Sequence, residues 1–219
     1  MAFLLGIETS GNLCSVALFR DGELIDDKEI QEESAHSKKI TLLIERILIQ
    51  NQLNKKDLNA IAISIGPGSY TGLRIGLSTA KGLCYGLDLP IIAVSTLRIM
   101  VEEAISLKDN YRQYLPMMDA RRMEIYGGIF DKNGSIILQE GAYILSENPF
   151  EKTLTKETLC FGNGAEKWDW QKDYPENFLK NILPRAKFMG KLAYNQFLNN
   201  EFADLVLLEP NYLKEYQGK

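Results

Sequence analysis

Two carboxylates occupy matching places in the two halves of the chain. Glu8 follows an apolar run that begins at Phe3, and Asp119 follows a second apolar run that begins at Tyr114. A carboxylate at the end of a buried strand can hold a metal ion and orient an attacking water. The pair is therefore the first candidate for hydrolytic chemistry in this sequence.

The turns that follow the two carboxylates favour a different role. Ser10-Gly11-Asn12 is a sparse version of a glycine-rich phosphate turn, and Arg121-Arg122 fills the second turn with large basic side chains. These side chains could neutralise Glu8 or Asp119 instead of leaving room for phosphates. We expect a structural or partner-binding role, with a small ATPase or phosphotransferase using both carboxylates across a cleft as the alternative.

Other reactive side chains are few. His36 is the only histidine, so the chain cannot supply a helical His pair for a metal, and no Ser-His-Asp set can be argued. Its place beside Ser37 is typical of a helix entry. Cys14, Cys84 and Cys160 are odd in number and lack Cys-x-x-Cys spacing, which predicts buried thiols in a reducing compartment and no structural zinc.

Composition limits the partners that the chain can bind alone. Its 219 residues, 45% of them hydrophobic, suffice for one large domain or two small lobes. The net charge of -4 argues against unaided binding of nucleic acid, so any RNA role would be shared with a partner. Three short basic pairs are most simply interpreted as solvated surface: Lys38-Lys39, Lys55-Lys56 and Arg121-Arg122. They could also add to an RNA-binding surface in a complex.

The apolar runs favour a cytoplasmic protein. The run from Ala2 to Ile7 has no basic flank and predicts a first strand, not a signal peptide. No run approaches the roughly 18 to 20 residues that a membrane span needs. We therefore expect no membrane association.

The elements that position the two carboxylates are predicted to repeat. Asp21-Gly22 and Asn133-Gly134 are tight-turn dipeptides, and each should join the second and third strands of a three-stranded meander. The first meander is predicted over Phe3 to Thr9, Leu13 to Arg20 and Glu23 to Ile30, and the second over Tyr114 to Asp119, Glu124 to Phe130 and Ser135 to Gln139. A repeat on this scale indicates duplication of a lobe.

Helices and further strands should follow each meander. Ser34 or Ser37 can cap a helix that contains Ile40, Leu43, Ile44 and Ile47, and Ser95 or Thr96 can cap another. The remaining predicted elements are a strand from Ala60 to Ile65, a helix from Ser69 to Leu87, strands over Leu89 to Val94 and Leu159 to Phe161, and a helix from Pro184 to Asn199. Residues 140–157 and 167–183 show no interpretable periodicity.

The helix from Ser69 contains glycines in its interior, each of which costs about 1 kcal/mol relative to alanine. An apolar stripe, formed by Leu73, Leu77, Ala80, Cys84 and Leu87, should lie on the sheet. An adjoining stripe lacks bulk and comprises Gly72, Gly76, Thr79, Leu83 and Gly86. Close approach of another helix would explain this groove, and that helix belongs either to the same lobe or to another protein.

A duplicated lobe with an acidic residue ending each first strand resembles the actin, Hsp70 and sugar-kinase superfamily. Three segments narrow the resemblance to the TsaB (YeaZ) family of tRNA threonylcarbamoyladenosine biosynthesis proteins: Gly6 to Ser10, Gly66-Pro67-Gly68-Ser69-Tyr70-Thr71-Gly72-Leu73-Arg74-Ile75-Gly76, and Asp119-Ala120-Arg121. The tail Pro210-Asn211-Tyr212-Leu213-Lys214 is also similar, with Lys214 where the family often has Arg.

The resemblance implies an α/β fold of duplicated actin-like, ribonuclease H-like lobes, each with a mixed five-stranded sheet and helices, the second lobe reduced. The expected boundaries are 1–105 for a dimerising N-terminal lobe and 106–219 for the C-terminal lobe. The implied function is that of a non-catalytic partner of the catalytic TsaD-like transferase, working with a TsaE-like small ATPase and tRNA. The isolated chain would form homodimers, and ATP and metal would be bound by the partner subunits.

Two sets of residues follow from this resemblance. The expected interface comprises His36, Pro67, Tyr70, Thr71, Arg74, Ile75, Gly76 and Thr79. The expected remnant of a nucleotide cleft comprises Glu8, Thr9, Ser10, Asp119, Arg121, Gly162 and Gly164. Gly162-Asn163-Gly164 resembles the superfamily's adenosine-binding turn, although a plain turn is the favoured interpretation. Two alternatives to the partner-subunit function stay open. The first is the independent small ATPase or phosphotransferase, and the second, less favoured, is a glycopeptidase-like hydrolase.

Overall fold

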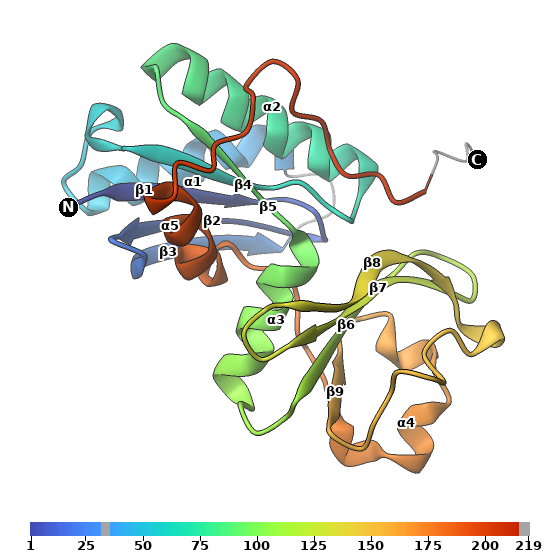
Figure 1. The fold of residues 1–219 in the computed structure, drawn as a ribbon. Coiled ribbons are helices and arrows are strands. Elements are labelled where there is room, and N and C mark those ends of the chain that lie inside the picture. Colours follow the sequence, from blue (N-terminus) through green and yellow to red (C-terminus); the bar gives the residue numbers. More distant parts are fainter. Residues whose placement is uncertain (32–35, 215–219) are drawn as a thin grey trace. The chain divides into compact units, whose positions relative to one another are not determined.

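The computed structural model describes residues 1–31 and 36–214. The chain forms two compact units, each of which is described by itself (Figure 1). Unit 1 comprises Met1–Ile99 and Pro184–Asn211, and unit 2 comprises Met100–Leu183 with the C-terminal residues. Among the described residues, no helix combines the length and apolar character that crossing a bilayer requires.

Unit 1 is built on a five-stranded mixed sheet with the strand order β3-β2-β1-β4-β5. Its strands are β1 (Phe3–Glu8), β2 (Leu13–Arg20), β3 (Glu23–Gln31), β4 (Ala60–Ser64) and β5 (Ile91–Val94). The first three form the antiparallel meander, and β1, β4 and β5 are parallel. The predicted turn between β2 and β3 is confirmed, since Asp21 and Gly22 both have positive φ.

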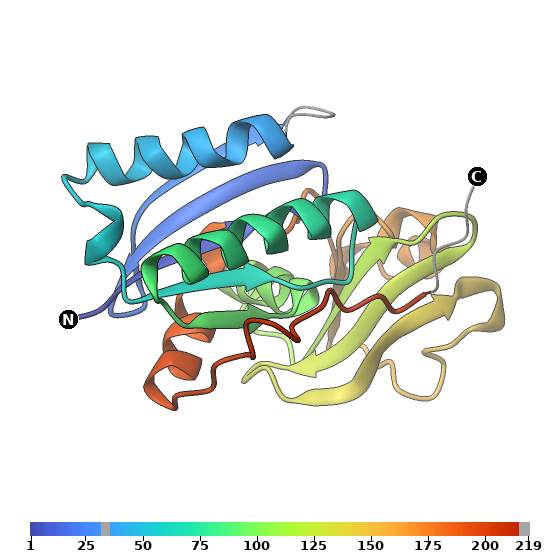
Figure 2. The same ribbon diagram turned by 90° about the horizontal axis from the view of Figure 1, so that it is seen from above.

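Two helices cover one face of this sheet. They are α1 (His36–Gln50) and α2 (Tyr70–Leu87), which lie side by side (Figure 2). Alternate strand residues such as Leu5, Ile7 and Ile61 pack against them. This alternation follows from the two-residue period of a strand.

The opposite face is covered by residues from the C-terminal part of the chain. The short 3-10 helix η5 (Ala186–Phe188) and helix α5 (Gly190–Leu198) pack on Leu4, Ala62 and Val94. Helix α3 (Thr96–Leu107) begins in unit 1 and continues into unit 2. Unit 1 is therefore a sheet between two helical layers.

Unit 2 repeats the same topology, with the strand order β8-β7-β6-β9-β10. The strands are β6 (Gln113–Asp119), β7 (Glu124–Asp131), β8 (Ile136–Ile144), β9 (Thr158–Phe161) and β10 (Phe178–Leu179). Corresponding strands pair in the same sense, antiparallel for β6-β7-β8 and parallel for β6-β9-β10. The duplicated α/β fold predicted from the sequence is confirmed.

The covering elements of unit 2 are short. They are α3, α4 (Trp170–Asp173) and the 3-10 helices η2 (Leu145–Glu147), η3 (Ala165–Lys167) and η4 (Pro175–Asn177). A further 3-10 helix, η1 (Lys55–Asp57), belongs to unit 1. Aromatic contacts fill the core beside them, with Phe150, Trp168, Trp170 and Tyr174 in successive ring contacts. This short-element layer explains why residues 140–157 and 167–183 have no periodicity.

The expected lobe boundaries differ from the observed ones. A division at residue 105 would place the segment after Pro184 in the second lobe, but Pro184–Asn211 groups with unit 1. The reason is that Ala186, Met189 and Leu192 fill the second hydrophobic core of the first sheet. Amphipathic spacing predicts a buried face but does not say which sheet will cover it.

Two capping predictions have clear outcomes. Helix α1 begins at His36, so Ser37 lies inside it and is not its cap, while Ser34 lies outside the described residues. The Oγ of Ser95 accepts a hydrogen bond from Arg98 N, as one of the two candidate caps of α3 should.

All three cysteines are free and buried, and burial raises the pKa of Cys84 to about 12.

Candidate functional site

The start of helix α2 is anchored on the turn after β1. Ser69 N donates to Ser10 O at 2.6 Å, and Thr9 Oγ1 donates to Gly72 O at 2.8 Å. Ser69 caps the helix through a hydrogen bond that its Oγ accepts from Gly72 N. The Gly-Pro-Gly segment thus joins the end of β4 to the end of β1.

Gly72 and Gly76 are required by this anchoring. A Cβ on Gly72 would overlap the carbonyl oxygen of Thr9, and a Cβ on Gly76 would overlap Thr9 Oγ1. Both glycines are buried. This part of the predicted groove is therefore filled by the chain's own strand end, and the interface role expected of Gly76 stays a prediction.

The later glycines of α2 are different. Gly82 and Gly86 are exposed, and a Cβ on either would meet nothing within 4 Å. Two of the four glycines thus have a structural reason within unit 1. The other two lie on open surface.

Glu8 is a fully buried carboxyl at the end of β1. Its Oε1 accepts a hydrogen bond from Ser10 N, whereas Oε2 has no partner among the described residues. The hydroxyls of Ser10 and Ser64 lie beside it but form no hydrogen bond with it in the described structure. Burial raises the pKa of Glu8, and the neighbouring donors lower it in part.

These surroundings are a poor fit to a metal-nucleotide site. Hard cations bind ionised carboxylates, whereas burial of Glu8 disfavours its ionised form. No group of three or more His, Cys, Asp or Glu side chains within residues 1–31 and 36–214 is placed to hold a metal. Gly68 packs so closely on Ser10 that a Cβ would overlap the Ser10 carbonyl.

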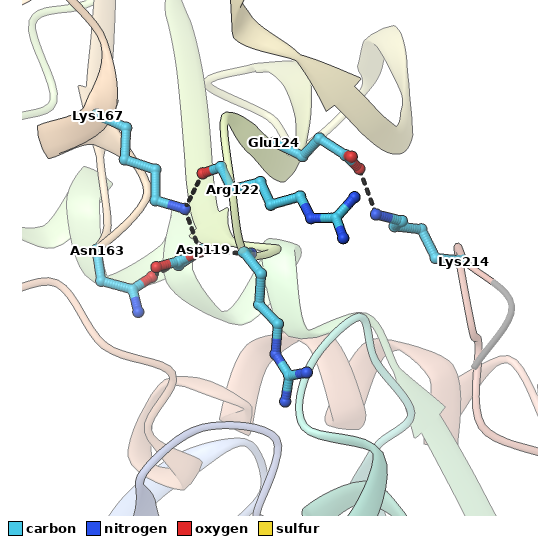
Figure 3. Close-up of polar contacts among 7 residues, drawn as sticks. Asp119, Arg122, Glu124, Asn163, Lys167 and Lys214 are labelled. Carbon is cyan, nitrogen blue, oxygen red and sulfur yellow. Dashed lines mark hydrogen bonds and ion pairs between the residues drawn. The ribbon is translucent and has the colours of Figure 1, made fainter. Parts of the chain in front are cut away.

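Asp119, the corresponding residue of unit 2, is held in a polar network (Figure 3). Its side chain pairs with Lys167 Nζ, and its Oδ1 also accepts a hydrogen bond from Arg121 N at 2.6 Å. Asp119 N donates to Asn163 Oδ1 at 2.9 Å. The carboxylate is therefore already neutralised by a cation from its own unit.

This network corrects one expectation about Asp119. Lys167, not a guanidinium of the following turn, is its ion-pair partner, and Arg121 contributes only its backbone N–H. Sequence reasoning missed Lys167, and it named Asn163 only as part of the Gly162-Asn163-Gly164 turn, not as a partner of Asp119. Lys167 lies in an uninterpreted segment, and nothing in the sequence marks a lysine 48 residues away as a partner.

Gly162 and Gly164 shape the loop that carries Asn163. Gly162 has φ +99°, and Gly164 N donates to Met117 O at 2.8 Å. Side chains at both positions would collide with β6. The glycines therefore have a structural role in a turn that packs on β6.

A cavity of about 730 Å³ lies elsewhere in unit 2. Its walls include the rings of Trp168, Trp170 and Tyr174 and the carboxylates of Glu151 and Asp173. None of the residues predicted as interface or nucleotide remnant lines it.

The outer surface of α1 and α2 exposes apolar side chains. Ile49 is 75% exposed and Leu42 is 49% exposed on α1, and Tyr85 is 85% exposed on α2. The two helices run in the same direction, so the C-terminal ends that carry Ile49 and Tyr85 lie at the same end of the layer (Figure 2). This surface, which we call the α1/α2 face, is unfilled by other described parts of unit 1.

The other expected interface residues divide between surface and interior. Thr71 and Arg74 are exposed, and Ile75 and Thr79 are partly exposed. Pro67 is buried, so its side chain is not available at a surface. The side chain of His36 lies outside the described residues.

Tyr70 and Arg74 are further joined to each other. The guanidinium of Arg74 lies 4.0 Å from the centroid of the Tyr70 ring and donates to the Tyr70 hydroxyl. Such a cation–π contact fixes both side chains on the first turn of α2.

The C-terminal segment of unit 1, residues 203–211, runs beside α2 and β5 (Figure 2). Ala203 N donates to Ile91 O, Lys81 Nζ donates to Val206 O, and Asn211 N donates to Ile65 O. Beyond it, Lys214 pairs with Glu124 in unit 2. Val206, 83% exposed, adds an apolar side chain beside α2.

Two sheets of identical strand order, each with a carboxylate ending its first strand, define a duplicated actin-like α/β protein. Comparison with known proteins narrows this class. Residues 29–148 match the family model described as TsaD, tRNA N6-adenosine threonylcarbamoyltransferase. The tRNA threonylcarbamoyladenosine biosynthesis protein TsaB of Escherichia coli is 32% identical, with 96% of this chain and 94% of that protein covered.

Two further comparisons also match this chain to proteins named TsaB or YeaZ. TsaB of Bacillus subtilis is 35% identical, with 96% of this chain and 93% of that protein covered. The structure of YeaZ from Pseudomonas aeruginosa has a TM-score of 0.81 at 26% identity, covering 97% of this chain and all of that one. The chain belongs to the TsaB family.

Proposed function

We propose that this chain is the non-catalytic partner subunit of a tRNA threonylcarbamoyladenosine modification complex. It pairs with a catalytic threonylcarbamoyltransferase homologue through the α1/α2 face, and with a copy of itself when isolated. A small ATPase of the TsaE type and tRNA join the assembly, and ATP and metal are held by the partner subunits. The site residues of this chain then serve contact and structure, not catalysis.

The exposed apolar α1/α2 face is the observation that carries this proposal. Ile49, Tyr85 and Leu42 expose large apolar side chains on adjacent helices of one layer. Large apolar patches on a surface mark protein interaction sites, and aromatic residues such as tyrosine are enriched in interfaces.

The match to the transferase family model supports a related partner. The matched residues, 29–148, include both α1 and α2. A protein that shares this segment would present a similar pair of helices. Two such pairs can pack face to face, as in the self-complementary contact of a symmetric dimer.

The buried state of Glu8 and the neutralised state of Asp119 support a non-catalytic role. Burial disfavours the ionised form of Glu8, and Asp119 is already paired with Lys167, so neither carboxylate is free to hold a hydrolytic metal. Transfer chemistry is therefore assigned to the partner.

Co-expression with the transferase homologue tests the pairing. Wild-type chain should co-purify in equal amount, whereas Ile49→Lys/Tyr85→Lys should abolish both the heterodimer and the homodimer. The matched control is Leu198→Lys, because Leu198 is 58% exposed near the end of α5 on the other helical layer. Unchanged pairing in the double variant, with its circular dichroism intact, would overturn the assignment of this face.

Calorimetric titration with Mg-ATP separates the proposal from an independent ATPase. The isolated chain should show no micromolar binding. Binding that is lost in Glu8→Ala but kept in Asp57→Ala, an exposed carboxylate of η1, would favour the ATPase instead.

A further inference from the structure

The hairpin tip between β6 and β7 has an unusual backbone. Arg121 has φ +69° and Arg122 has φ +48°, both in the left-handed region that glycine and asparagine occupy most easily. The two arginines are consecutive, and both are exposed. Strain of this kind persists only where the surroundings enforce it, and it is concentrated at functional sites.

Three contacts enforce this conformation. Asp119 Oδ1 accepts from Arg121 N, and Glu124 N donates to Arg121 O at 3.1 Å. Lys167 Nζ donates to Arg122 O at 2.7 Å while pairing with Asp119 (Figure 3). The backbone groups are thus held from inside unit 2, which leaves the two arginine side chains outside.

The charges around the tip are unbalanced. Asp119 is paired with Lys167, and Glu124 is paired with Lys214. Among the described residues, no ion pair joins either guanidinium of the tip to a carboxylate, so two positive charges remain. Figure 3 shows the Arg122 side chain extending away from Lys167, toward the side where Lys214 lies.

We propose that Arg121 and Arg122 form a clamp for the phosphodiester backbone of RNA. Guanidinium groups bind phosphate oxygens through paired hydrogen bonds. The chain has a net charge of -4, so an exposed cation pair of this kind must attract anions locally against the field of the whole molecule. The inference rests on the proposed function, since it supplies that complex with a contact to its tRNA.

The test compares variants that differ in charge and in backbone preference. Arg121→Asn/Arg122→Gly removes both charges while giving the turn residues that accept positive φ. Arg121→Lys/Arg122→Lys keeps the charges. Lys55→Gln/Lys56→Gln is the matched control, because Lys55 and Lys56 are an exposed basic pair in unit 1.

Fluorescence anisotropy with labelled tRNA, on the chain together with the transferase homologue and on the chain alone, gives the readout. Arg121→Asn/Arg122→Gly should weaken binding at least about tenfold, since the loss of even one charge-assisted hydrogen bond changes affinity by about that factor. The slope of log K against log salt should fall by about 1 for each arginine removed. The lysine variant should keep most of this slope, and the control should match wild type.

Two outcomes overturn the clamp. Equal tRNA affinity and salt slope in wild type and Arg121→Asn/Arg122→Gly would remove its physical basis. Loss of pairing with the transferase at unchanged tRNA affinity would make the tip a protein contact. If wild-type chain does not pair with the transferase, the proposed function fails. The clamp then stands or falls on whether the isolated chain at low salt shows the same difference in slope.

Discussion

At the residue scale, Thr9 determines where helix α2 can lie. Its carbonyl and hydroxyl oxygens occupy the space where Cβ atoms of residues 72 and 76 would be. The two glycines are therefore needed for packing, whatever partner the helix meets.

Alanine substitutions along α2 should have opposite effects. Gly72→Ala should lower the free energy of unfolding by at least about 2 kcal/mol, because the new methyl group overlaps Thr9 O. Gly82→Ala should raise it by about 0.5 to 1 kcal/mol, because the site is open and alanine is the better helix former. Urea unfolding measures both, and equal effects would contradict the described contact.

Glu8 should make stability depend on pH. Burial raises its pKa above the ordinary value of 4.5, so the folded chain binds this proton more tightly than the unfolded chain. The resulting stabilisation is complete below pH 4.5 and is lost as the pH rises through the folded pKa. Glu8→Gln removes this titration, so the stability of the variant relative to wild type should increase as the pH rises above 4.5.

Chemical unfolding at several pH values measures this difference. Asp57→Asn is the matched control, since it makes the same carboxylate-to-amide change at an exposed side chain. A constant difference between Glu8→Gln and wild type over this range would contradict the burial of the carboxyl.

At the scale of elements, the β6-β7 hairpin should be less stable than a hairpin with turn-forming residues at positions 121 and 122. Asparagine and glycine adopt positive φ at lower cost than arginine. Arg121→Asn/Arg122→Gly should therefore raise the free energy of unfolding by about 1 to 2 kcal/mol. Thermal melting of this variant beside Lys55→Gln/Lys56→Gln tests the expectation, and a lower Tm for the hairpin variant would contradict it.

The meanders and the long helix could be predicted because local chemistry specifies them. Asp21-Gly22 requires positive φ, and Ser69 supplies a cap at the start of α2. In contrast, β10 contains two residues and α4 contains four, too few for a period to show. Their positions depend on aromatic packing around Trp168 and Trp170, which pattern reasoning does not capture.

The candidate site was predictable only in part. Glu8 and Asp119 were identified because they end apolar runs, and both end their strands as predicted. The spacing of glycines in α2 predicted close approach but not the approaching group. Both Gly72 and Gly76 meet Thr9 of the same unit. The contact of Thr9 with Gly72 spans 63 residues, and no local pattern encodes it.

At the scale of the whole molecule, the first unit depends on the end of the chain. A fragment ending at residue 105 lacks Met189, Leu192 and Ala193, which cover one face of its sheet. Each buried Met or Leu contributes roughly 1.5 to 3 kcal/mol, against a total stability of about 5 to 15 kcal/mol for a typical domain. Fragment 1–105 should therefore be unfolded or aggregated by circular dichroism and sizing.

Addition of the missing segment provides the control for this fragment. Co-expression of residues 184–211 should restore a soluble complex, whereas the same peptide with Met189→Asp and Leu192→Asp should not. A folded, monomeric fragment 1–105 would show that α5 is dispensable, contrary to the core that it completes.

The return of residues 184–211 to the first sheet also orders events on the ribosome. Residues 100–183 are translated before α5, so the second unit has its whole sheet available while the first still lacks one cover. At about 5 to 20 residues per second, the synthesis of residues 100–183 lasts several seconds. The sheet that is synthesised first is therefore the last to be covered on both faces, and its open face is the surface on which a chaperone would act.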